Sequence, residues 1–72
     1  MATEDVCVRV GKRIRSLRKA KGWNQDDLAV HIGLGRTYIS NVERGLKNPS
    51  LRSLEIFAIG FRMSLSDFLK GV

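Results

Sequence analysis

The sequence predicts an all-α protein built from five short helices in one domain. Apolar residues recur every three or four positions in several segments, which is the spacing of one helix face. Glycine, serine and asparagine stand between these segments, where helices begin and end. No segment alternates apolar and polar residues for long enough to form a strand. A chain of 72 residues, of which 43% are hydrophobic, holds one small core, so residues 1–72 are expected to be a single domain.

The first helix is predicted from about Asp5 to Ala20. Its inner face carries apolar residues at spacings of four, four and three, namely Val6, Val10, Ile14 and Leu17. Gly22 follows the last turn, where glycine commonly ends a helix. Lys19 and Lys21 suit the negative end of the helix dipole.

A second helix is predicted after Asn24, which is a good N-cap. Asp26 and Asp27 fall in its first turn, where the helix dipole favours negative charge. Gly33 tolerates a positive φ and ends this helix. The residues expected to point inward are Leu28, Ala29 and Ile32.

The third helix is predicted to begin near Gly35 or Arg36 and to end before Gly45. Ile39 and Val42 lie on its inner face. Two helices that cross at a steep angle need a small residue where they approach, and Ala29 is the candidate. This pattern predicts a helix-turn-helix at about residues 25–44, whose second helix is shaped for a DNA major groove.

Two more helices are predicted in the last third of the chain. Ser50 can cap a helix that ends or bends at Gly60. Its expected apolar face consists of Leu51, Leu54, Phe57 and Ala58. Ser64 and Asp67 have capping-box spacing for a short final helix, which holds Leu65, Phe68 and Leu69.

The charge of the chain favours a polyanionic partner. The formal net charge is +6, and eleven basic residues share the stretch from Arg9 to Arg52 with only three acidic ones, a local balance of +8. Nucleic acid is the first candidate for such a domain. Ribosomal proteins and helices on membrane surfaces have similar charge, so charge alone leaves these classes open.

Other chemistry finds little support in the sequence. Cys7 is the single cysteine and His31 the single histidine, so neither a disulfide within the chain nor a metal site is expected. No set of residues suits catalysis, a cofactor or a small-molecule ligand, so the chain is not expected to be an enzyme. A signal peptide and an apolar run of about 18 residues are also missing, which predicts a cytoplasmic protein without a membrane partner.

The region from about Ile14 to Phe68 resembles the lambdoid phage repressor and Cro family, also called XRE-type helix-turn-helix regulators. The matching residues are Ile14, Arg15, Leu17, Arg18, Gly22, Gln25, Leu28, Ala29, Gly33, Ile39, Ser40, Glu43, Gly45, Pro49, Ser50, Leu54 and Leu69. The run RTYIS-x-x-ERG-x-x-NPS is also similar to the small controller proteins of restriction-modification systems. The resemblance implies a five-helix lambda-repressor-like DNA-binding domain.

The resemblance implies that Arg36, Thr37 and Asn41 face base edges. Arginine can donate two hydrogen bonds to guanine, asparagine can pair with adenine, and the threonine methyl can pack on a thymine methyl. The alternative for Arg36 is a contact with phosphate only. Gly35 stands where the family commonly has a capping serine or threonine, which leaves the register of this helix less firmly set.

Phosphate contact is expected first at Gln25, because it opens a helix whose free N–H groups and dipole favour an anion. The matching glutamine of the family clamps the DNA backbone. Asn24 is a second candidate, although capping alone explains it. Further candidates, each of which has an ordinary solvated side chain as its alternative, are Tyr38, Ser40, Arg44, Lys47, Asn48 and Arg52.

Two other expectations concern contacts within the protein. The resemblance implies that Glu43 pairs with Arg18 of the first helix. It also implies a homodimer, and the apolar residues near the chain end offer an interface, unless they all pack internally. The candidate interface residues are Phe61, Met63, Leu65, Phe68 and Leu69.

The expected function is a transcription regulator that binds a near-palindromic double-stranded DNA operator as a homodimer. A restriction-modification controller competes with a phage-type or general repressor. An antitoxin that also binds DNA and a basic RNA-binding module are alternatives from other classes.

Overall fold

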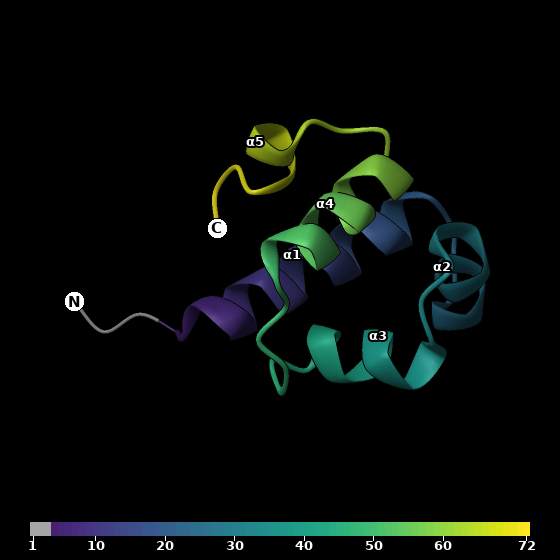
Figure 1. The fold of residues 1–72 in the computed structure, drawn as a ribbon, viewed down its shortest axis with the longest axis horizontal. Helices are drawn as coiled ribbons and strands as arrows, with labels where there is room; N and C mark the ends of the chain where they lie inside the picture. The colour runs from purple at the N-terminus through teal and green to yellow at the C-terminus, as the bar shows by residue number, and fades with distance from the viewer. Residues whose placement is uncertain (1–3) are drawn as a thin grey trace.

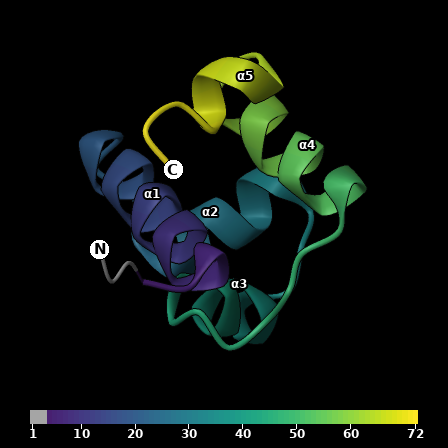
Figure 2. The same cartoon turned by 90° about the vertical axis from the view of Figure 1, so that its left-hand side faces the viewer.

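The computed structural model describes residues 4–72, and this part of the chain is helical, with no strand. The five helices are α1 (Val6–Ala20), α2 (Gln25–Ile32), α3 (Arg36–Glu43), α4 (Leu51–Gly60) and α5 (Leu65–Phe68). Helix α1 runs along one side of the molecule, and α3 and α5 lie at opposite ends of the other helices (Figures 1 and 2). The predicted number, order and type of elements are therefore correct.

Helix α1 begins where the sequence predicts, because the Asp5 side chain accepts a hydrogen bond of 2.9 Å from the Cys7 backbone N–H. Val10 and Ile14 are buried, and Leu17 packs against the core. Val6 is 51% exposed, so its predicted place on the inner face is wrong. Val6 is the first residue of α1 and lies at a surface hollow that Asn48, Pro49 and Leu54 also line.

The α2–turn–α3 unit is fixed by local hydrogen bonds and one glycine. Asn24 and Asp27 form a reciprocal capping box at the start of α2. Gly33 ends α2 with a φ of 72°, a left-handed conformation that costs glycine little. Gly35 is the N-cap residue of α3, and its lack of a side chain leaves this end without a side-chain cap.

Helices α4 and α5 start at Ser50 and Ser64, whose hydroxyl groups accept hydrogen bonds of 3.1 Å from the backbone N–H groups of Ser53 and Asp67. Phe57 and Ala58 of α4 are buried. Leu51, which was expected on the same inner face, is 72% exposed, so that part of the prediction is wrong. It occupies the first position of α4, where the chain has only just left the loop.

The core is closed by aromatic side chains from the last third of the chain. Phe57 and Phe61 each stack near Phe68, with ring centroids 6.4 and 6.3 Å apart. Trp23 packs between His31 and Phe61, at centroid distances of 4.6 and 6.1 Å. The short helix α5 therefore belongs to the core of the single chain through Phe68, which is fully buried.

The backbones of α1 and the end of α3 approach each other closely at Gly11. A Cβ atom at Gly11 would lie 2.5 Å from the Glu43 carbonyl oxygen and still closer to that of Val42. The small residue predicted for the crossing of α2 and α3, Ala29, is partly buried and packs against the core, whereas the sequence did not indicate this crossing of α1 and α3. The contact joins residues about thirty positions apart, so no local pattern marks it.

Candidate nucleic-acid interface

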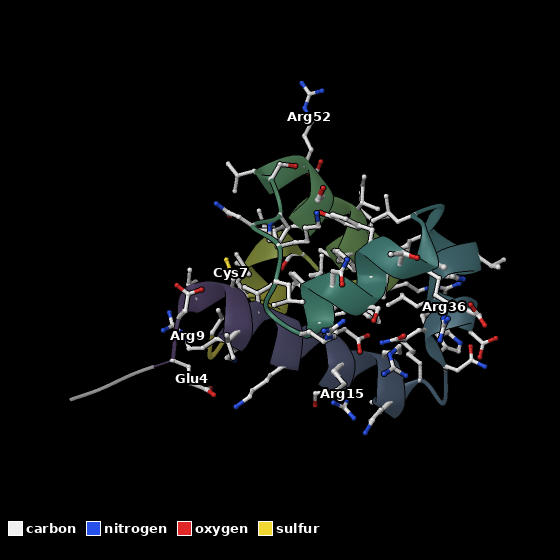
Figure 3. The ribbon with its side chains drawn as sticks, turned by 90° about the horizontal axis from the view of Figure 1, so that it is seen from below. Glu4, Cys7, Arg9, Arg15, Arg36 and Arg52 are labelled. Atoms are coloured by element: carbon white, nitrogen blue, oxygen red, sulfur yellow. The ribbon has the colours of Figure 1, made fainter. Side chains whose placement is uncertain are left out.

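Helix α3 presents a polar outer side and an apolar inner side. Ile39 and Val42 are fully buried against the core, and the two first residues, Arg36 and Thr37, are exposed. Asn41, one turn further along the same helix, is half-buried. Figure 3, seen from below the view of Figure 1, shows this outer side facing the viewer with Arg36 at the end nearest α2.

Arg36 is held by an acidic neighbour from the preceding helix. Its Nε atom lies 3.2 Å from Oδ1 of Asp26, in the first turn of α2. Both side chains are largely exposed, at 64% and 71%. The two terminal nitrogen atoms of Arg36 thus remain available to a ligand outside the protein.

Asn41 makes one weak side-chain contact, with Arg44 at the end of α3, and one backbone hydrogen bond to the loop that follows. Nη1 of Arg44 lies 3.5 Å from its Oδ1 atom, and its carbonyl oxygen accepts a hydrogen bond of 2.9 Å from the Leu46 N–H. The second contact fixes the loop that follows α3. Its side-chain amide group makes no other hydrogen bond within residues 4–72, so it can serve a base edge.

Gln25 is tied into a buried ion pair beneath α3. Arg18 donates to Glu43 through Nε at 2.7 Å and through Nη2 at 3.0 Å, as a bidentate pair. Nε2 of Gln25 donates to the same carboxylate at 3.2 Å. Hydrogen bonding to Glu43 raises the pKa of Arg18 above its usual range, and burial opposes this only in part. The predicted Arg18–Glu43 pair is therefore present, and it also orients Gln25.

The start of α2 offers backbone donors next to Gln25. The first-turn N–H groups of Gln25 and Asp26 have no partner within a helix, and the helix dipole favours an anion there. The Asn24 side chain accepts a hydrogen bond of 2.7 Å from the Asp27 N–H. Capping thus occupies the Asn24 oxygen, whereas its amide N–H groups stay free for phosphate.

The remaining phosphate candidates fall into two groups. Tyr38 and Ser40 are half-buried, and Tyr38 packs against the core. The other four are exposed and lie at the end of α3, in the following loop and at the start of α4; they are Arg44, Lys47, Asn48 and Arg52. Arg52 extends away from the body of the molecule (Figure 3).

The five candidate interface residues near the chain end lie mostly inside the monomer. Phe61 is 3% exposed and Phe68 is fully buried, so neither has surface to give to a second subunit. Met63, Leu65 and Leu69 are partly buried against the same core. The exposed apolar side chains of this region belong to α4 instead, where Ile59 is 67% and Ile56 36% exposed.

Other kinds of site find no support in residues 4–72. No group of three or more potential metal-ligating side chains occurs in this part of the chain. None of the helices in residues 4–72 has both the length and the apolar character that a membrane crossing requires.

Two polar side chains outside the interface serve the fold. His31 packs on the Trp23 ring. Arg13 donates hydrogen bonds of 2.9 Å to the carbonyl oxygens of Phe68 and Asp67.

A capped α2, a glycine turn and an outward-facing α3 define a helix-turn-helix protein. The chain belongs to this family, because the family model described as Helix-turn-helix matches residues 14–68. It is 36% identical to the control protein C.MunI of Mycoplasma over 69 residues, which cover 94% of this chain and 93% of that protein.

Solved structures of restriction-modification controller proteins have the same fold. C.AhdI of Aeromonas hydrophila superposes with a TM-score of 0.81 at 39% identity, over 86% of this chain and 94% of that one. C.Esp1396I, solved as a tetramer with its natural 35 base-pair operator, gives a TM-score of 0.84 at 35% identity. This second match covers 94% of this chain and 90% of that one. The predicted family and its narrower likeness to controller proteins are therefore confirmed.

Proposed function

We propose that this protein is a transcription regulator that binds a near-palindromic operator in double-stranded DNA as a homodimer. The observation that carries the proposal is the outer side of α3. Arg36 and Thr37 are exposed on this side, and Arg36 contacts Asp26 at the start of α2. Gln25 and free backbone N–H groups at that helix start suit a phosphate. The function is one of binding, without a catalytic step.

The relatives favour a controller of restriction-modification genes over other regulators. Several of the relatives that match most of this chain are controller proteins, namely C.MunI, C.BamHI and C.AhdI, which match 94%, 93% and 86% of it. In this proposal Arg36, Thr37 and Asn41 read bases. Gln25, Asn24 and the exposed cations that follow α3 contact phosphate.

We place the dimer interface on the exposed side of α4, with Met63, Leu65 and Leu69 at its border. Ile56 and Ile59 lie beside a shallow hollow formed with His31, Ile32 and Gly60. Burial of this apolar surface by a second copy is the driving force for association. This assignment replaces Phe61 and Phe68, whose side chains the monomer core already uses.

The test selects bound sites from random duplex DNA and repeats the selection with Arg36→Ala and Lys47→Ala. We expect a palindrome from the wild type. Arg36→Ala should lose one base preference per half-site, worth about 1–3 kcal/mol for a bidentate contact. Lys47→Ala should weaken binding to all sequences about equally. It should also reduce the slope of log affinity against log salt concentration by about one. Unchanged base preferences in Arg36→Ala would refute the assigned reading role.

A further inference from the structure

The pair between Asp26 and Arg36 joins the two helices of the helix-turn-helix on its outer side. Asp26 approaches the guanidinium at Nε, with 3.2 Å between Nε and Oδ1. The guanidinium group is planar and carries five N–H donors in a fixed arrangement. The ion pair draws the guanidinium toward the first turn of α2, and neither Nη1 nor Nη2 makes a hydrogen bond within residues 4–72.

We propose that Asp26 is a positioning residue for base recognition, which holds the Arg36 fork in the orientation that meets guanine. Guanine offers O6 and N7 as two acceptors on its major-groove edge, and arginine recognises them with two donors. A long, exposed side chain loses conformational entropy when it makes such a contact. Asp26 restricts Arg36 before DNA arrives, so less entropy is lost on binding. The inference rests on the proposed function.

The position of Asp26 supports a specific role for this carboxylate. The helix dipole favours both Asp26 and Asp27 in the first turn of α2, but an acidic side chain beside a DNA-binding surface also repels phosphate. The helix-turn-helix contains three acidic residues. Asp27 caps α2 by accepting from the Asn24 N–H at 2.9 Å, and Glu43 is buried with Arg18. Asp26 is the one whose carboxylate contacts a proposed base-reading side chain.

The effect on specificity is expected to be moderate, because both partners are largely exposed to solvent. Exposed ion pairs change an equilibrium by up to about fivefold. Removal of the Asp26 charge has two consequences of opposite kind. It raises the affinity for all DNA by removing a repulsion, and it lowers the preference for guanine over other bases at the position that Arg36 reads.

The experiment compares Asp26→Asn with Asp27→Asn, which removes the same charge from the same helical turn. Asparagine at position 27 keeps an oxygen acceptor for the Asn24 N–H, so the cap is retained. Dissociation constants are measured for the selected operator and for the operator with the Arg36-dependent guanine replaced. The readout is the dissociation constant for the replaced operator divided by that for the selected operator, which measures the preference for guanine. Circular dichroism verifies equal helix content in all variants.

We expect Asp26→Asn to lower the ratio by about two- to fivefold, whereas Asp27→Asn leaves it unchanged. In an Arg36→Ala background, Asp26→Asn should have no effect on the ratio. An equal ratio in both single variants would overturn the positioning role, as would an effect that persists without Arg36. If Arg36→Ala itself keeps the guanine preference, the base-reading part of the proposed function fails first, and the inference fails with it.

Discussion

At the scale of single residues, the Glu43 side chain connects three helices of the site. It accepts two hydrogen bonds from Arg18 and one from Gln25, and its side chain is only 4% exposed. The carboxylate thus joins α1, the start of α2 and the end of α3. This acid on the helix proposed to face DNA thus has a structural role, because it ties α3 to α1 and orients the Gln25 side chain.

We predict that Glu43→Ala lowers the free energy of unfolding by about 3–5 kcal/mol, because it leaves the Arg18 charge buried without its partner. The double variant Arg18→Met/Glu43→Leu should be markedly more stable than Glu43→Ala, since it removes both charges and refills the space. Urea unfolding at one fixed protein concentration measures both. If the double variant were no more stable than Glu43→Ala, the buried charge would not be the cause.

A second prediction concerns the thiol of Cys7 near the start of α1. Desolvation by its surroundings, with a smaller effect from Asp5, raises the pKa of Cys7, so less thiolate forms at a given pH. The fold favours the neutral thiol. Its contribution to stability is thus present below the unfolded-state pKa and lost as pH rises through the folded-state pKa.

We therefore expect iodoacetamide to alkylate Cys7 in the folded protein more slowly than in urea at the same mildly alkaline pH. Asp5→Asn keeps a capping oxygen but removes the charge, and should speed the reaction in part. The rate should stay below that of the unfolded chain because desolvation is the larger cause. Equal rates in the folded and unfolded chain would contradict the prediction.

At the scale of helices, the sequence was sufficient wherever the determining interactions are local. Asn24, Ser50 and Ser64 cap the helices predicted to follow them, because each bond spans only three residues. The exposure of Leu51 and the close approach at Gly11 depend on which helices meet in space. The Asp26–Arg36 contact was missed for the same reason, since it forms only once α2 and α3 have packed.

Gly11 provides a test at this scale. We predict that Gly11→Ala destabilises the protein by about 1–3 kcal/mol, although alanine is the better helix former by roughly 1 kcal/mol. The added Cβ meets backbone carbonyl groups of Val42 and Glu43, which cannot move unless α3 shifts. The midpoint temperature of thermal unfolding and the affinity for the operator should both fall.

The control is Ser16→Ala, at an exposed position of the same helix. It should leave stability the same or slightly higher, because nothing opposes its gain in helix propensity. A Gly11→Ala variant as stable as Ser16→Ala would show that α1 and α3 can separate without cost.

At the scale of the whole molecule, the two proposed binding functions occupy different surfaces. Helix α3 lies at one end of the molecule, and the hollow beside Ile56 and Ile59 of α4 is lined by residues of α2 and α4, with none from α3 (Figures 1 and 2). One recognition helix reads only a few base pairs, and a two-fold dimer places two such helices about 34–36 Å apart on successive turns of DNA. The last aromatic residues of the chain build its core, and the exposed side of α4 carries the proposed contact with a second copy.

The last prediction follows from that division. Ile59→Ser should convert the dimer to a monomer and leave the fold intact, because Ile59 is 67% exposed in the single chain. Val6→Ser makes a similar change at an exposed residue near the opposite end of the sequence, and it should remain dimeric. Sedimentation velocity distinguishes the two states, and circular dichroism checks the fold. Operator affinity should fall steeply only in Ile59→Ser, since a monomer contacts a single half-site, whereas affinity for non-specific DNA should change little. A dimeric Ile59→Ser variant would exclude this surface of α4 as the interface.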